Sequence, residues 1–208
     1  MYSQHHENSK LFNALLLIFP KSDAFLLATL LQKNFYQETI RYEEIEVAKS
    51  QMKDLILLAF EERILIPLSS RSGPAWEDKI LDFNQEGLFY IPPVVKSILN
   101  TMCETGQPCC QTALRKTLAE MAWEDDSGFI NMLQTIMKHA KNYNFEAGLL
   151  ELFFKMAPLE CDSHDFLDIA VACGMISPCP QKSMLTGLSW YEINPALYWD
   201  KAFLAPFL

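Results

Sequence analysis

The spacing of apolar residues predicts helices followed by a short β-hairpin in the first half of the chain. Apolar side chains recur every three or four positions over residues 23–35 and again over 52–59, as on one face of an amphipathic helix. The pattern then changes to a β-branched run at residues 64–67, which ends in proline. A turn-rich stretch at 69–74 follows, and an apolar run returns at 88–91. We therefore predict that 64–67 pairs with 88–91.

The C-terminal third has the same order of patterns. Three blocks align in sequence order: residues 23–31 with 146–154, residues 55–67 with 166–178 without a gap, and residues 91–93 with 193–195. Similarity that keeps its order in this way is typical of a diverged duplication. It predicts a second hairpin, in which residues 175–178 pair with 190–193.

A helical connector is predicted between the two copies. Residues 94–103, 112–121 and 129–140 each have helical spacing, and polar breaks separate them. We therefore expect a mainly α protein with small β-hairpins. Its predicted parts are a first unit over residues 1–93, the connector over 94–143 and a second, shorter unit over 144–208.

The order of helices, strand, turn and strand resembles the winged helix, the helix-turn-helix variant in which a β-hairpin follows the last helix. The resemblance is clearest in the second copy, over residues 166–177 and the return strand 189–195. There the ending Tyr191-x-Ile193-Asn194-Pro195 is similar to the second wing strand of winged-helix plasmid replication initiators. Because this motif is short, the resemblance implies the fold and not the activity.

Composition and charge narrow the classes of function. The 208 residues are 50% hydrophobic and carry a formal net charge of −9, which disfavours a general attraction to nucleic acid or to an anionic membrane. Only 7 glycines are present, and no glycine-rich phosphate-binding motif occurs. No apolar run reaches the roughly 20 residues of a membrane-spanning helix, and no signal peptide is evident. We expect a cytoplasmic protein without a membrane contact.

DNA binding is the first alternative, because the winged helix invites it. Candidate contacts in the first copy are Lys49, Gln51 and Lys53 from the last helix, and Arg71 and Lys79 from the hairpin. Acidic residues surround these positions, and the second copy has no Lys or Arg from residue 156 to 181. Such a surface would repel phosphates, so the charges favour ordinary solvated side chains over DNA contacts.

A thiol or metal sensor is the second alternative. Cys109 and Cys110 are adjacent and could respond to an oxidant, with Arg115 and Lys116 as the nearby cations. The spacing of the 6 cysteines does not match a structural zinc site, so buried or loop thiols are the better interpretation and no cofactor is expected.

The chain end is unusually aromatic. Trp199, Phe203 and Phe207 recur at four-residue spacing and could form one stripe of a short helix. Such a stripe must be covered. It either closes the core of its own unit or contacts a second subunit or another partner.

No catalytic motif with a nucleophile and its base occurs in the sequence. We therefore expect a non-enzymatic regulatory or assembly factor that acts through protein–protein contacts, with another protein or a second copy of the chain as its partner. The alternatives are a DNA-binding transcriptional regulator or replication-associated protein, and a thiol or metal sensor.

Overall fold

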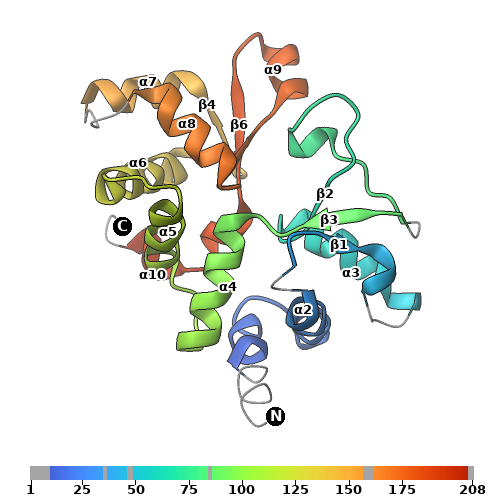
Figure 1. Cartoon of the computed structure of the whole chain (residues 1–208). Helices are drawn as coiled ribbons and strands as arrows, with labels where there is room; N and C mark the ends of the chain where they lie inside the picture. Colours follow the sequence, from blue (N-terminus) through green and yellow to red (C-terminus); the bar gives the residue numbers. More distant parts are fainter. Residues whose placement is uncertain (1–9, 35–36, 46–48, 84–85, 157–161, 206–208) are drawn as a thin grey trace.

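Two small antiparallel sheets, each flanked by helices, organise the chain (Figure 1). The computed structural model describes residues 10–34, 37–45, 49–83, 86–156 and 162–205. Within these residues most of the regular structure is helical. The predicted fold class, mainly α with small β-hairpins, is confirmed.

The first sheet lies within residues 40–90. Its elements, with the helix before them, are α2 (Lys21–Asn34), β1 (Ile40–Arg41), the 3₁₀ helix η1 (Tyr42–Glu44), α3 (Lys49–Glu61), β2 (Ile66–Pro67), the 3₁₀ helix η2 (Trp76–Asp78) and β3 (Leu88–Tyr90). β3 lies between β1 and β2, and Ile66 faces Tyr90. The predicted pairing of this first hairpin, residues 66–90, is confirmed over a shorter stretch.

The predicted connector is helical, as expected. It contains α4 (Pro93–Thr105), α5 (Cys110–Glu120) and α6 (Asp126–His139). Gly106, in the left-handed conformation with φ of 80°, ends α4. The carboxylate of Asp125 accepts a hydrogen bond from the backbone N–H of Gly128 and so caps the start of α6.

The second sheet lies within residues 144–193. Its elements and those that follow are β4 (Asn144–Glu146), α7 (Ala147–Met156), α8 (Ser163–Ala172), β5 (Ile176–Pro178), α9 (Pro180–Thr186), β6 (Trp190–Ile193), the 3₁₀ helix η3 (Pro195–Tyr198) and α10 (Lys201–Leu204). β6 lies between β4 and β5, and Ser177 faces Glu192. The predicted pairing of this second hairpin, residues 176–193, is confirmed.

The two sheets share their strand order and their register. Ile66 faces Tyr90 in the first sheet, and Ser177 faces Glu192 in the second. Ser177 lies 111 residues after Ile66 and Glu192 lies 102 residues after Tyr90, which are the offsets of the last two alignment blocks. The outer strands β1 and β4, which the sequence did not predict, also pair alike with the central strand. Arg41 faces Leu88 in one sheet, and Glu146 faces Trp190 in the other.

The short length of β2 has a local cause at the end of α3. The backbone N–H groups of Ile64 and Leu65 donate to the carbonyl of Ala59, at 2.8 and 3.0 Å, so they are not available to a neighbouring strand. Met175 makes the equivalent bond to Ala170 at the end of α8. β2 therefore begins at Ile66 and β5 at Ile176, each later than the start of the predicted strand.

The first block of the predicted alignment is wrong. It equates α2 with α7, but α2 precedes the first strand of its sheet whereas α7 follows β4. By element order the counterpart of α2 is α6, which the sequence analysis assigned to the connector. The error has a physical origin, because apolar residues at helical spacing look alike in any buried helix and do not identify which helix is meant.

One continuous core joins the two halves, and phenylalanines from both lie fully buried in it. The backbone N–H of Val94 donates to the carbonyl of Cys173 at 3.0 Å. From the second half to the first, the side-chain amide of Asn194 donates to the carbonyl of Arg63 at 3.4 Å. The halves therefore hold each other through residues that follow the last strand of each half, Val94 and Asn194.

No helix in the described part of the chain combines the length and the apolar character that crossing a membrane requires.

Candidate protein-contact site on the second hairpin

The second hairpin carries exposed apolar side chains at its tip. Met184 and Leu185 on α9 are 86% and 88% exposed, and Leu188, just after the helix, is 46% exposed. α9 stands at the far end of the hairpin, away from α4, α5 and α6 (Figure 1). We call these three residues the apolar tip. Single exposed apolar residues are ordinary on proteins, but a group of them at a projecting point is typical of a contact surface.

Local sequence explains why a helix forms at this tip. Pro180 occupies its first position, where the missing N–H has no cost and the fixed φ suits the helix. Gly187 ends the helix at φ of 71°, a left-handed conformation that glycine adopts without strain. The short helix therefore places Met184 and Leu185 on an ordered surface.

The base of the tip is held by Trp190. Its indole N–H donates to the hydroxyl of Thr186 at 2.9 Å, and its backbone N–H donates to the hydroxyl of Ser183 at 2.9 Å. The ammonium group of Lys182 lies 3.7 Å from the centre of the Trp190 ring, a cation–π contact. Lys182 is also the only charged residue from position 178 to 190, so the segment carries no acidic residue.

The first hairpin braces the second. A carboxylate oxygen of Glu77 accepts a hydrogen bond from the backbone N–H of Gln181 in the first turn of α9. The backbone N–H of buried Trp76 donates to the buried hydroxyl of Ser177 at 2.9 Å. A carboxylate at this end of a helix also interacts favourably with the helix dipole. The position of α9 therefore depends on residues that lie about a hundred positions earlier in the sequence.

An ion pair links the end of α3 to the second hairpin below α9. Two nitrogens of the Arg63 guanidinium donate to the two carboxylate oxygens of Glu192, at 3.1 and 3.2 Å. The side chains are only 15% and 18% exposed, and the guanidinium lies over the rings of Phe60 and Trp76. Burial raises the pKa of Glu192, and the positive charge of Arg63 partly opposes that rise.

The candidate DNA contacts of α3 lie among acidic neighbours. Gln51 and Lys53 are exposed, and the ammonium group of Lys53 lies 5.7 Å from the centre of the Phe83 ring. The side chain of Lys49, at the start of α3, lies outside the described residues. Asp54 is exposed on the same helix. The structure thus brings two of the predicted polar residues to the exposed face of one helix, next to a carboxylate that repels phosphate.

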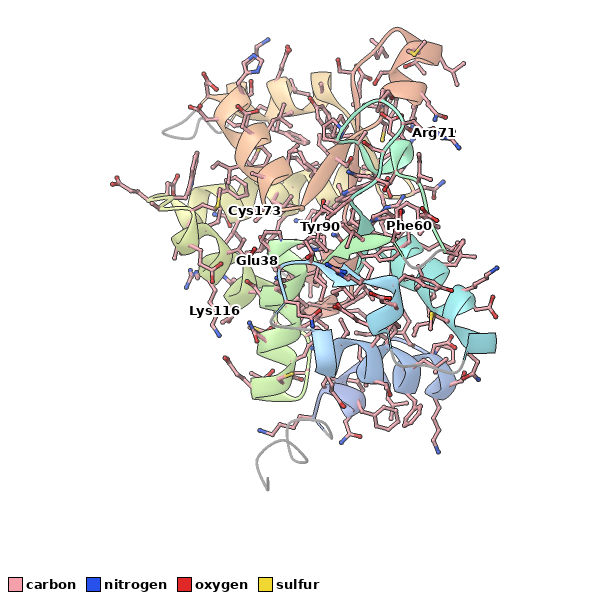
Figure 2. All side chains as sticks on the ribbon, turned by 45° about the vertical axis from the view of Figure 1, so that its right-hand side comes forward. Glu38, Phe60, Arg71, Tyr90, Lys116 and Cys173 are labelled. Atoms are coloured by element: carbon pink, nitrogen blue, oxygen red, sulfur yellow. The ribbon has the colours of Figure 1, made fainter. Side chains whose placement is uncertain are left out.

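The hairpin candidates Arg71 and Lys79 lie on opposite sides of a narrow loop. The backbone N–H of Arg71 donates to the carbonyl of Asp78 at 2.8 Å, and the Arg71 side chain is exposed. Figure 2 shows Arg71 on the side of the molecule from which the second hairpin projects. Lys79 is half-buried, and this burial lowers its pKa.

The helix of the second half that corresponds to α3 is acidic on its exposed side. Asp162, Asp165 and Asp168 are all exposed along α8 or at its start. Asp162 accepts hydrogen bonds from the backbone N–H groups of Asp165 and His164, and the first of these does most to lower its pKa. Asp162 therefore stays ionised, and the α8 surface is unsuited to DNA.

The vicinal cysteines differ in their surroundings. Cys110 is fully buried, its backbone N–H donates to the carboxylate of Asp200 at 2.9 Å, and burial strongly raises the pKa of its thiol. Cys109 is half-buried, with its sulfur 3.1 Å from the hydroxyl of Thr112. Because the thiolate is the reactive form, the surroundings of Cys110 favour an inert thiol.

The other strongly perturbed thiols have a similar character. Burial raises the pKa of Cys173 to about 11 and that of Cys179 to about 12. Across the described ranges, no three His, Cys, Asp or Glu side chains gather in a way that could hold a metal ion.

The aromatic chain end packs on the protein itself. The ring of Trp199 meets that of Phe19 edge to face at 5.5 Å, and its indole N–H donates to a carboxylate oxygen of Glu62 at 3.4 Å. Phe203 is buried, and its carbonyl accepts a hydrogen bond from the side chain of Gln134 at 2.7 Å. Phe207 lies outside the described residues. Of the two interpretations of this stripe, the packing of Trp199 and Phe203 supports core closure.

The sequence analysis missed the apolar tip. The signal was present, because Met184 and Leu185 lie between Pro180 and Gly187 in a segment without acidic residues. Two apolar residues in so short a helix and a third just after it show no clear periodicity, and their exposure becomes evident only when the hairpin is seen to project.

One comparison with known proteins finds a relationship. A protein-family model matches residues 17–201, which include both sheets, both hairpins and the apolar tip. The chain belongs to this family. The description of the family states no activity, ligand or partner. No curated protein and no solved structure matches the chain.

Proposed function

We propose that this protein is a non-enzymatic regulatory or assembly factor that binds another protein through the apolar tip of its second hairpin. The observation that carries the proposal is the near-complete exposure of Met184 and Leu185 on an ordered, projecting helix. Covering such side chains is favourable, by roughly 1.5 to 3 kcal/mol for each one fully buried. Leaving them exposed lowers the solubility of the protein, and a binding role explains why they are exposed.

The proposal includes two winged-helix-like units in tandem, with the two hairpins as their wings. It is supported by the shared strand order, by the identical register of the paired strands and by the left-handed residue after each last helix, Arg63 and Gly174. Wings commonly contact DNA, but here the second wing has an apolar end and the helix before it is acidic. These features support a unit adapted to a protein partner.

Affinity purification of the full chain from its native cells tests the proposal. The double variant Met184→Asp with Leu185→Asp should lose the proteins that copurify with the natural chain, and nuclease treatment should not release them. The matched control is Leu152→Asp on α7, where Leu152 is also exposed. Retention of the same proteins by the double variant, with an unchanged circular dichroism spectrum, would disprove the role of the tip.

A further inference from the structure

We propose that the occupant of the apolar tip is an amphipathic helix of a different protein, with acidic residues beside its apolar face. This inference rests on the function proposed above and adds the chemistry of the partner. It follows from the size of the tip, from its charge and from its place beside the first hairpin.

The size of the tip argues against a dimer of this chain formed through it. Three exposed side chains make an apolar patch on the order of a few hundred Å². A stable dimer usually buries about 800 Å² on each subunit. Two tips in contact would therefore leave most of the required interface to surfaces that are polar and charged.

The charge of the tip argues in the same direction. A symmetric dimer formed through so small a tip would hold the two copies of Lys182 within the same interface. Like charges held close together in this way are unfavourable. A partner with carboxylates opposite Lys182 has no such conflict.

Although the protein as a whole is acidic, the residues around the tip favour an acidic partner there. The chain has a net charge of −9, and its α8 surface would repel carboxylates. The second hairpin has no acidic residue from position 178 to 190, and exposed Arg71 adds a positive charge on the neighbouring first hairpin. The carboxylate of Glu77 is engaged with the backbone of α9. The tip segment itself is thus free of acidic residues, and Lys182 and Arg71 can attract the carboxylates of an apolar segment in competition with Glu77, which keeps its negative charge beside the start of α9.

The geometry suits a helix as the occupant. Met184 and Leu185 lie in the last turn of α9, and Leu188 follows Gly187 directly after the helix, so the apolar tip is a small patch at the C-terminal end of α9. An amphipathic helix can cover a patch of this size with two or three apolar residues at three- and four-residue intervals, and its flanking carboxylates can then reach Lys182.

A peptide library tests the charge preference directly. The probes are displayed peptides of about 18 residues, long enough to form a helix, with leucines fixed at helical spacing and the other positions varied among Glu, Lys and Ser. The full chain serves as bait, and peptides that also bind the Met184→Asp, Leu185→Asp double variant are discarded. We expect the remaining peptides to be enriched in Glu over Lys.

Charge reversal supplies the second measurement, made on a synthetic copy of the most enriched peptide. Lys182→Glu should weaken its binding by about tenfold, because the flanking carboxylates lose their partner. Lys155→Glu, at an exposed position in the last turn of α7, is the matched control and should leave the affinity unchanged.

The outcomes separate this inference from the proposed function. Enrichment of Lys-rich or uncharged peptides would overturn the acidic partner and leave a protein-binding tip in place. Binding of the full chain to phosphatidylserine vesicles, lost in Leu185→Asp, would show that the tip meets a membrane instead. If no peptide distinguishes the natural chain from the double variant, a helical occupant is excluded, while the affinity purification still decides whether the tip binds a protein.

Discussion

Arg63 combines a strained backbone with a nearly buried ion pair. Its φ is 53°, in the left-handed region where a residue with a side chain is disfavoured by roughly 1 to 2 kcal/mol. Gly174, at the corresponding place in the second half, has φ of 70° without that cost. The guanidinium that accompanies the strain at Arg63 pairs with Glu192 of the other half. The contact between the halves therefore explains why an arginine, which is unfavourable in this turn, occupies position 63.

Replacing Arg63 tests this interpretation. Arg63→Met leaves the carboxylate of Glu192 without its partner in a mostly buried place, and we expect a loss of about 2 to 3 kcal/mol in the free energy of unfolding, less than for a fully buried pair. Urea unfolding measures it. Arg71→Met, at an exposed arginine, should change stability little. Equal effects of the two substitutions would contradict a specific role for the pair.

The same substitution has a predicted pH dependence. Burial already raises the pKa of Glu192 in the folded state, so the folded protein binds more protons than the unfolded one just above the ordinary glutamate pKa, and stability falls as pH rises through that range. Without Arg63 the pKa of Glu192 rises further, so stability falls with rising pH over a wider pH range. Arg63→Met should therefore destabilise the protein less at about pH 5 than at about pH 7.5. An effect that grows on acidification would contradict this assignment.

Gly174 lies at a close approach between the halves. A Cβ placed on Gly174 would lie 2.5 Å from the Cβ of Pro92, whereas a Cβ placed on Gly106 would meet nothing within 4 Å. Both glycines have positive φ, so Gly106→Ala should cost about 1 kcal/mol through the backbone alone. Gly174→Ala should cost about 1 to 3 kcal/mol more, because its methyl group collides with Pro92. Equal losses in thermal or urea unfolding would show that the approach is unimportant.

At the scale of elements, the sequence predicted most helices and both hairpins because their signals are local. Residues 64–67 and 88–91 carried the β-branched and apolar runs of paired strands. β1 and β4 were missed because two or three residues are too few to show alternation. The predicted equivalence of α2 and α7 was wrong because apolar residues at helical spacing do not identify which helix is meant. The contacts of Glu77 with Gln181 and of Arg63 with Glu192 join residues over 100 positions apart, which no local pattern reveals.

The dependence of α9 on the first hairpin gives a prediction for that element. Glu77→Ala removes the carboxylate that accepts from the Gln181 N–H, and loss of such a cap typically costs about 1 kcal/mol. Hydrogen exchange of the α9 amides should accelerate by roughly fivefold, with little change in the exchange of α4. Asp78→Ala, on the neighbouring residue, serves as the control. If both variants accelerate α9 equally, the effect belongs to the first hairpin as a whole and not to the cap.

At the scale of the whole molecule, the distribution of charge separates a protein partner from DNA. Lys53 and Arg71 are exposed, but the net charge is −9 and the α8 surface is acidic. We therefore expect no submicromolar binding to duplex DNA even at about 50 mM salt, a condition that exaggerates electrostatic attraction. Fluorescence anisotropy with labelled duplexes measures it. Tight, salt-sensitive binding that Lys53→Ala or Arg71→Ala abolishes would favour the DNA-binding alternative.

The most direct test of the central claim is site-specific photo-crosslinking in living cells. A photoreactive phenylalanine derivative replaces Leu185 at the apolar tip or, as a control, Leu152 on α7, which is exposed on another surface. The account predicts a crosslinked adduct at position 185 that protease destroys and nuclease does not, and no corresponding adduct at position 152. The absence of any adduct at position 185, or an adduct there that nuclease removes, would contradict it.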